Sequence, residues 1–316
     1  MRAVHADWSV DPRKRWMAVA DDNGGGWVLN SPEPVGDVTT LFARLRDGAE
    51  TVALGVDLPL GLPRAFVARH CRQDGFVAFL RDLADRPEFF EVCAELSNLS
   101  PSRPFYPMRG AKFMTRASHA SALGLGSADE LSRVCDRATA ERPAGCPLFW
   151  TLGANQTGKA AIAAWRDLLL PAIGRGDAPR LWPFEGDFRQ LLAKPGIVMA
   201  ETYPAEALRQ LGLRLIGSKR RQADRALLAG SLLDVLHRLA VTPTQTLRDA
   251  ITDGFGADAA GEDRLDCVLG VLAVINVLAG HRPDGVPPDP WLRTWEGWVL
   301  GQIAFPVHFP LELPAG

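Results

Sequence analysis

An apolar run near the end of the chain, residues 267–279, limits the fold more than any other feature. Its valines, leucines and isoleucines recur on nearly every helical face, and Asn276 is its one strongly polar member. A helix that is apolar nearly all round is buried in a core. The run is too short to cross a bilayer. We therefore expect a buried helix around which the other elements pack.

Two carboxylates stand at the start of this run. Asp263 and Asp266 are three residues apart in the segment Glu262-Asp-Arg-Leu-Asp266, so on a helix they share one face. Like charges at this spacing cost roughly a few tenths of a kcal/mol, so an ordinary helix gains nothing from them. One interpretation is a site for a divalent cation. The other is that acids in a first turn suit the helix dipole.

Composition narrows the class of protein. The 316 residues are 47% hydrophobic and 23% charged, with a formal net charge of −2, which is typical of a globular protein and argues against nonspecific nucleic-acid binding over the whole surface. A local basic groove stays possible. The five cysteines are widely spaced without a Cys-x-x-Cys pair, which indicates a reducing compartment. The N-terminus lacks a signal-peptide core. We expect a cytoplasmic protein with no membrane partner.

Strand-like segments open the chain in a distinctive order. Apolar segments at 2–9, 16–20 and 27–30 predict three strands, 37–46 has helical spacing, and 51–56 is a continuous apolar run typical of a buried strand. The order is β-β-β-α-β. Asp7 lies near the end of the first strand, and Asp57 directly follows the last.

From about residue 64 to 194 helical patterns predominate, among them 88–96 and 128–140, between Pro- and Gly-rich breaks. Strand signal returns at 196–200 and is followed by Glu201. Helices are then expected up to the apolar run. The middle of the chain therefore reads as a helical insertion or cap.

An acidic set results from this order. Asp7, Asp57 and Glu201 each close a predicted strand, and Asp263 and Asp266 stand on the late helix. Mg²⁺ and Mn²⁺ prefer such hard oxygen ligands, and two ions about 4 Å apart can activate water and stabilise a leaving oxygen in phosphodiester hydrolysis. A single Asp after a strand is more often a turn residue. Several such segments together favour a two-metal site.

These segments carry a resemblance. The strand order with Asp7 in VHADWS resembles the ribonuclease H-like fold. VALGVDLPLGLP, MAETYPAEAL and EDRLDCVLGVLAV resemble the predicted nucleases grouped as domain of unknown function 429, and the terminal acid pair is similar to that of RuvC-type resolvases. The resemblance covers roughly residues 1–63 and 196–300. It implies metal-ligand positions for Asp7, Asp57, Glu201 and either Asp263 or Asp266. A shared fold does not by itself confer a reaction.

A second motif, Gly153-Ala-Asn-Gln-Thr-Gly-Lys159, fits a phosphate-binding P-loop except that Ala160 replaces the Ser or Thr that normally holds magnesium. No βαβ series surrounds it, as a nucleotide-hydrolysing domain requires. It remains an alternative for phosphoryl transfer.

Basic residues form two groups that could bind phosphates of a nucleic acid. Lys219, Arg220 and Arg221 form one group, and Arg109 and Lys112 follow the aromatic pair Phe105-Tyr106. Unpaired bases can stack on aromatic rings. The alternatives are a solvated helix face for the first group and a charged loop for the second.

The sequence thus predicts an α/β protein with a mixed sheet, antiparallel over its first three strands and then parallel. Its ribonuclease H-like core would comprise residues 1–63 and 196–300, with a helical insertion at 64–195 and a tail at 301–316. The predicted function is metal-dependent hydrolysis of phosphodiester bonds in DNA or RNA. A degenerate module that binds nucleic acid or nucleotide without cutting is the first alternative, and the P-loop enzyme is the second.

Overall fold

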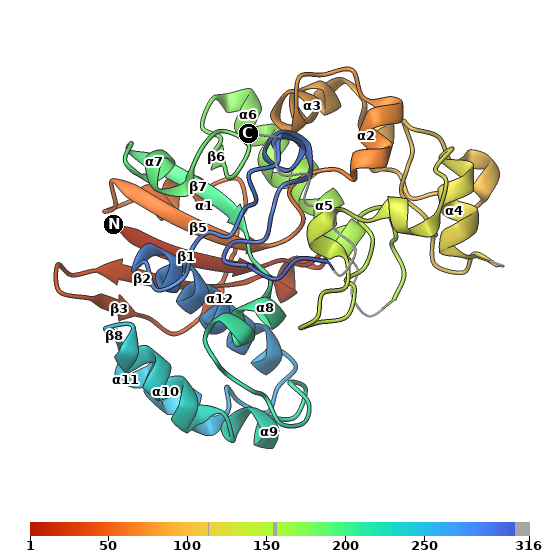
Figure 1. Ribbon diagram of the computed structural model, residues 1–316. Coiled ribbons are helices and arrows are strands. Elements are labelled where there is room, and N and C mark those ends of the chain that lie inside the picture. The colour runs from red at the N-terminus through yellow and green to blue at the C-terminus, as the bar shows by residue number, and fades with distance from the viewer. Residues whose placement is uncertain (113, 154–156, 307–316) are drawn as a thin grey trace. The chain divides into compact units, whose positions relative to one another are not determined.

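Short apolar segments pair into a mixed sheet in the computed structural model, which describes residues 1–112, 114–153 and 157–306 (Figure 1). The strands run in the order β6-β7-β5-β1-β2-β3-β8, and β4 pairs with β2. Their bounds are β1 (Arg2–Asp7), β2 (Trp16–Asp22), β3 (Trp27–Leu29), β4 (Glu33–Pro34), β5 (Thr51–Asp57), β6 (Arg180–Leu181), β7 (Gly196–Glu201) and β8 (Val241–Pro243).

Strand directions agree with the predicted mixture. β1, β2 and β3 are antiparallel neighbours, whereas β5 lies parallel to β1 and β7 parallel to β5. The predicted α/β class with a mixed sheet flanked by helices is confirmed. β4, β6 and β8 were not predicted, because strands of two or three residues are too short to show a period.

The chain divides into two compact units. We call residues 1–58, 163–286 and 299–302 the sheet unit, and residues 59–162, 287–298 and 303–306 the second unit. The predicted core and insertion differ from this division in two main respects. Residues 287–298 are predicted as part of the core, but they belong to the second unit. Residues 163–195 were assigned to the insertion, but they join the sheet unit, since β6 pairs with β7 there.

The sheet unit also contains helices. They are α1 (Leu41–Arg46), α6 (Leu170–Arg175), α7 (Phe188–Leu192), α8 (Pro204–Gln210), α9 (Gln222–Ala226), α10 (Ala229–Arg238), α11 (Gln245–Asp253) and α12 (Gly261–Leu278), with a 3₁₀ turn at Pro12–Lys14 and a π-helix at Trp165–Leu169. Of these helices, α1, α7, α10, α11 and α12 contact the strands of the unit. α1 begins later than the predicted residue 37, because the Asp37 carboxylate accepts from the Thr39 N–H at 2.8 Å and forms a turn.

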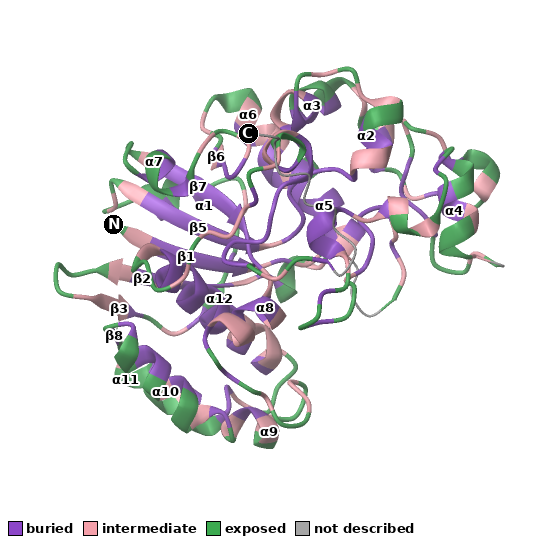
Figure 2. Ribbon diagram, in the orientation of Figure 1, coloured by how far each residue is buried: buried purple, intermediate pink, exposed green. Residues whose placement is uncertain are grey.

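The apolar run is the buried helix that the sequence predicts. Residues 267–277 of α12 are all buried, and α12 contacts β1, β2, β5 and α8. Figure 2 shows the central strands and α12 in the colour of buried residues. The continuous apolar β5 is buried from Val52 to Val56, as expected for a central parallel strand.

Two glycines let α12 lie close to the sheet. A Cβ at Gly270 would collide with the ring of His5 in β1, and one at Gly55 in β5 would come within 2.8 Å of the Val274 side chain. Gly270 and Val274 are one helical turn apart, so they lie on the same face of α12. Asp266 is one turn earlier on that face. Asp7 shares the His5 face of β1, because alternate strand residues point the same way.

The second unit contains α2 (Arg64–His70), α3 (Phe76–Asp82), α4 (Arg116–Ala122) and short helical turns at Leu83–Asp85, Pro87–Phe90, Leu96–Asn98, Ala128–Leu131, Val134–Asp136 and Leu292–Glu296. α5 (Thr157–Ala164) extends over the boundary between the two units.

The predicted helices at 88–96 and 128–140 are wrong. Their apolar residues serve an irregular core instead, in which the Phe89 and Phe105 rings lie 5.7 Å apart edge to face. The Cys93 N–H donates to the Phe105 carbonyl at 2.8 Å, which takes it out of a helical ladder. Tertiary packing thus overrides the local helical pattern.

No helix in the described part of the chain combines the length and the apolarity that a membrane span requires.

Candidate metal centre

Three predicted acids close neighbouring strands of the sheet unit. Asp7 at the end of β1 is the register partner of Asp57 at the end of β5, and these strands are parallel. Register partners in parallel strands point to the same face. Asp7 and Asp57 therefore stand side by side at the carboxyl edge of the sheet, on the face that α12 covers.

Glu201 takes a different orientation. Its register partner is Val56 and not Asp57, so strand alternation places it on the opposite face of the sheet. The residue that follows it, Thr202, approaches the site of a Cβ on Gly55 and thus lies on the α12 side. Glu201 is buried, and its charge still reaches Asp57. The sequence pattern does not predict that Glu201 faces the other side of the sheet from Asp7 and Asp57, because this depends on a register offset of one residue.

The helix acids complete the group from above the sheet. Asp263 and Asp266 lie in the first two turns of α12, and each is half-buried. Both carboxylates act electrostatically on Asp7. The structure therefore brings together Asp7, Asp57, Asp263 and Asp266, and we call these four residues the acid cluster.

Burial and mutual repulsion make these carboxyl groups reluctant to ionise. The pKa of Asp7 is raised well above its ordinary value by burial, then by the charges of Asp57, Asp266 and Asp263. Burial and the charge of Asp266 raise the pKa of Asp57 to about 7. Burial and then Asp266 raise the pKa of Asp263 to about 6. A nearby cation would relieve all three shifts.

One cation of the chain itself already stands in this group. The Lys219 ammonium donates to Asp266 Oδ1 at 2.5 Å. Although burial acts to lower it, the pKa of Lys219 is raised, since Asp266 and Asp57 both favour the charged form. Sequence reasoning assigned Lys219 to phosphate binding with Arg220 and Arg221. In the structure its ion-pair partner is Asp266, one of the two α12 carboxylates that the sequence predicts as metal ligands.

His5 lies behind the acid cluster on the same face of β1. Its side chain is fully buried, and neither ring nitrogen has a hydrogen-bond partner among the described residues. Burial and then the charge of Lys219 lower its pKa to about 3. His5 is therefore neutral at physiological pH and adds no positive charge to the site.

The carboxylates are near one another without yet forming a closed cage. Among the described residues, no three of the five predicted acids have ligand oxygens that all lie within 4.8 Å of one another. A cation held by three of them would therefore need side-chain rotation.

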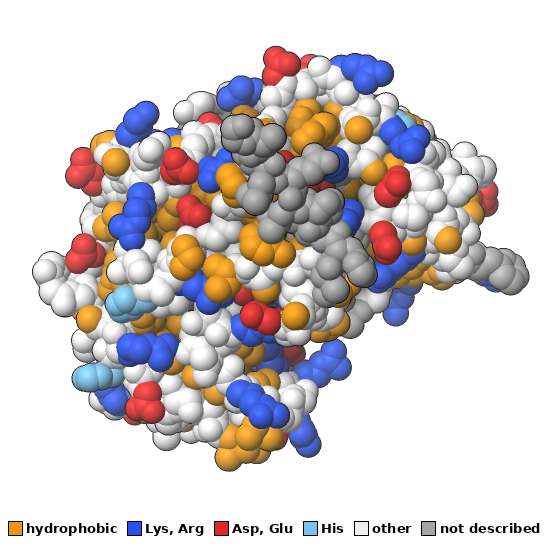
Figure 3. All heavy atoms as spheres, in the orientation of Figure 1, with side chains coloured by type: hydrophobic (Ala, Val, Ile, Leu, Met, Phe, Trp, Pro, Cys, Tyr) orange, Lys and Arg blue, Asp and Glu red, His pale blue; other side chains and the backbone are white. Residues whose placement is uncertain are grey.

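The remaining basic candidates are more exposed. Arg221 is paired with Asp224 at 2.6 Å, and Arg220 lies 4.0 Å from Glu262. Both side chains are largely exposed. In Figure 3 lysines and arginines are interspersed with acids on the face drawn, and form no continuous basic stripe there.

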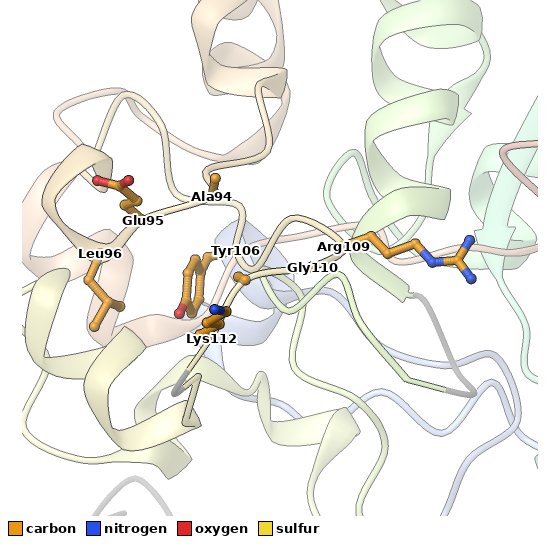
Figure 4. A pocket seen from close by; sticks show the side chains of 8 residues that line it. Ala94, Glu95, Leu96, Tyr106, Arg109, Gly110 and Lys112 are labelled. Atoms are coloured by element: carbon orange, nitrogen blue, oxygen red, sulfur yellow. The ribbon is translucent and has the colours of Figure 1, made fainter.

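In the second unit Arg109 and Lys112 line an open pocket of about 570 Å³ together with Glu95, Leu96 and Tyr106. Figure 4 shows the Arg109 side chain extending away from Tyr106 and Lys112. The Tyr106 ring is 1% exposed and packs edge to face on His119. It therefore offers little surface for a base to stack on.

The P-loop-like motif falls partly outside the described residues, at 154–156. Its described end begins α5, where Gly158 packs tightly against the Leu148 carbonyl and Lys159 is half-buried. Residues 148–153 form only an isolated bridge, at Trp150. The strand that precedes a P-loop is thus missing from this described stretch.

Comparison of the chain with protein-family models, with curated proteins and with solved structures gives no match. The function proposed below is therefore based on the geometry of the acid cluster.

Proposed function

We propose that the protein is a divalent-metal-dependent nuclease that hydrolyses phosphodiester bonds of nucleic acid at the acid cluster. The observation that carries the proposal is the pairing of Asp7 with Asp57 across parallel strands, opposite Asp263 and Asp266 on α12. Crowded carboxylates with raised pKa values are costly to a fold. A cation-binding role explains why the chain keeps them together.

Sheet topology supports a ribonuclease H-like core as part of this proposal. The order β3-β2-β1-β5-β7, antiparallel over the first three strands and parallel over the rest, is the order that the resemblance implies. The same resemblance implies metal ligands at Asp7 and Asp57, which end β1 and β5. A shared fold does not specify a reaction, so the proposed activity depends on the carboxylates of the acid cluster.

The donor set fits magnesium or manganese. The acid cluster offers hard carboxylate oxygens, which these ions prefer, and each of the four side chains keeps some exposure to solvent. Asp7 and Asp57 would hold an ion, opposite Asp263 and Asp266 on α12. Glu201 would act through its charge on Asp57, from the other face of the sheet.

In the proposed reaction a water oxygen attacks phosphorus and loses a proton, and the bond from phosphorus to the leaving sugar oxygen breaks as that oxygen takes up a proton from a solvent water. A bound divalent ion would polarise the phosphate and favour ionisation of the water. Asp263, a half-buried carboxylate of α12, would accept the proton that the attacking water loses. Lys219 places positive charge beside the cluster, where negative charge develops on the phosphate.

The test is a cleavage assay with Mn²⁺ on single-stranded, duplex, hybrid and branched substrates. Asp57→Asn should lower cleavage at least about 100-fold, the scale on which single catalytic groups act. Asp234→Asn, the same substitution on the exposed face of α10, should leave it unchanged. Equal loss in both variants, or cleavage that survives Asp57→Asn, would remove the acid cluster from the reaction.

One observation favours a second candidate, a module that binds nucleic acid without cutting it. Asp266 is already neutralised by Lys219, and no three of the predicted acids surround a common point within the described residues. Binding of one substrate without cleavage in any metal would favour this module. A P-loop enzyme requires instead that Lys159→Ala abolish nucleotide binding while Asp57→Asn preserves it.

A further inference from the structure

Hydrogen bonds from one buried arginine hold the backbone at Lys219 in place. The Arg225 side chain is 1% exposed and donates to the backbone carbonyl of Lys219. It also donates to the Gly254 carbonyl at 2.8 Å and the Gly256 carbonyl at 2.6 Å. One buried guanidinium thus ties the Lys219 backbone to the segment that leads into α12.

The surrounding segment is fixed as well. Asp224 accepts from the Ser218 N–H at 2.7 Å and from Arg221 at 2.6 Å. A Cβ at Gly261, the first residue of α12, would collide with the Arg225 guanidinium. A glycine at this position allows Arg225 to pack against the start of the helix that carries Asp263 and Asp266. The position of Lys219 is therefore set by the fold and not by the ion pair alone.

The Lys219 charge acts on the whole site. Its ammonium lies 2.5 Å from Asp266 Oδ1, and its field is felt at Asp57, Asp7 and His5. A divalent ion at Asp266 would stand beside this ammonium, and like charges at such a distance repel strongly in a partly buried site. Lys219 forms its ion pair with Asp266 and with neither Asp7 nor Asp57, so these two carboxylates are the better place for an ion.

From this geometry we infer that Lys219 takes the place of the second metal ion, so that the site holds one divalent ion at Asp7 and Asp57. This inference rests on the proposed function and differs from the two-metal site that the sequence predicts. In a two-metal site the second ion stabilises the leaving oxygen. Here the ammonium, a compact charge with three donors, is placed to contact the phosphate instead.

The test counts bound Mn²⁺ by electron paramagnetic resonance of the free ion, with the full chain and saturating metal. Wild type should bind one ion and Lys219→Met two, since the substitution frees Asp266. Lys219→Arg keeps the charge and should bind one. Lys194→Met, the same change at an exposed lysine of the sheet unit, should also bind one. The double variant Lys219→Met/Asp266→Asn should return to one.

Each outcome has a defined meaning. Two ions in wild type, or one ion in a folded Lys219→Met protein, would overturn the inference and leave the nuclease proposal standing. No ion in wild type would overturn both. If Lys219→Met does not fold, Lys219→Arg and Asp266→Asn decide the question, because two ions in either variant would contradict a single-metal site.

Discussion

Asp57→Asn should stabilise the metal-free protein, although it removes a residue central to the proposed activity. Burial and the charge of Asp266 raise the pKa of Asp57 from 3.8 to about 7. A carboxyl group whose pKa is raised on folding binds more protons in the native state than in the unfolded state. Stability therefore falls as the pH rises from about 4 to about 7, and the full penalty is present above that range.

The size of the effect follows from that shift. A difference of about 3 pKa units corresponds to about 4 kcal/mol. Asp57 keeps some solvent exposure and Lys219 offsets part of the repulsion, so we expect about 1–2 kcal/mol, or roughly 3–6 °C in the unfolding temperature. At pH 5 roughly a third of the gain should remain, because native Asp57 is then protonated.

The assay is differential scanning calorimetry of wild type and Asp57→Asn at pH 8 and pH 5 with a chelator, then at pH 8 with Mg²⁺. Magnesium should raise the unfolding temperature of wild type more than that of the variant, since ligands stabilise the state that binds them. A variant less stable than wild type at pH 8 without metal would refute the reasoning. A gain of equal size at both pH values would refute it as well.

Two further predictions concern how the site is held. Gly270→Ala should destabilise the protein by roughly 1–3 kcal/mol, because its methyl group would enter the space of the His5 ring. The control, Gly230→Ala on the exposed face of α10, should be neutral or stabilising. Urea unfolding measures both variants, and equal effects would contradict the close packing of α12. Arg225→Met should lower the free energy of unfolding by roughly 2 kcal/mol or more, because three backbone carbonyls lose the guanidinium that donates to them. Arg220→Met, at an 82% exposed side chain, should change it by no more than about 0.5 kcal/mol. A small effect of Arg225→Met would show that the Lys219 segment does not depend on it.

Much of the sheet and of the acid cluster follows from local sequence patterns. The apolar runs before Asp57 and after Asp266 each specify one buried element, and Asp7 and Asp57 come together because parallel neighbours end at the same edge. The orientation of Glu201 depends on pairing with Val56, a one-residue register that no single-strand pattern encodes.

The sequence also gives no indication that Lys219 pairs with Asp266. A basic triplet predicts a solvated or phosphate-binding segment, and nothing local shows that buried Arg225 fixes one member of it against Asp266. The predicted helix at 88–96 fails for a similar reason, since the Cys93 N–H bonds to the carbonyl of Phe105.

The central claim is that Asp7 and Asp57 hold a divalent ion. Crystals grown with Mn²⁺ and measured for anomalous scattering test it most directly. We predict an anomalous peak bound by carboxylate oxygens of both Asp7 and Asp57, with Lys219 still contacting Asp266. A folded protein with no peak at these residues, or with manganese bound only elsewhere, would contradict the account.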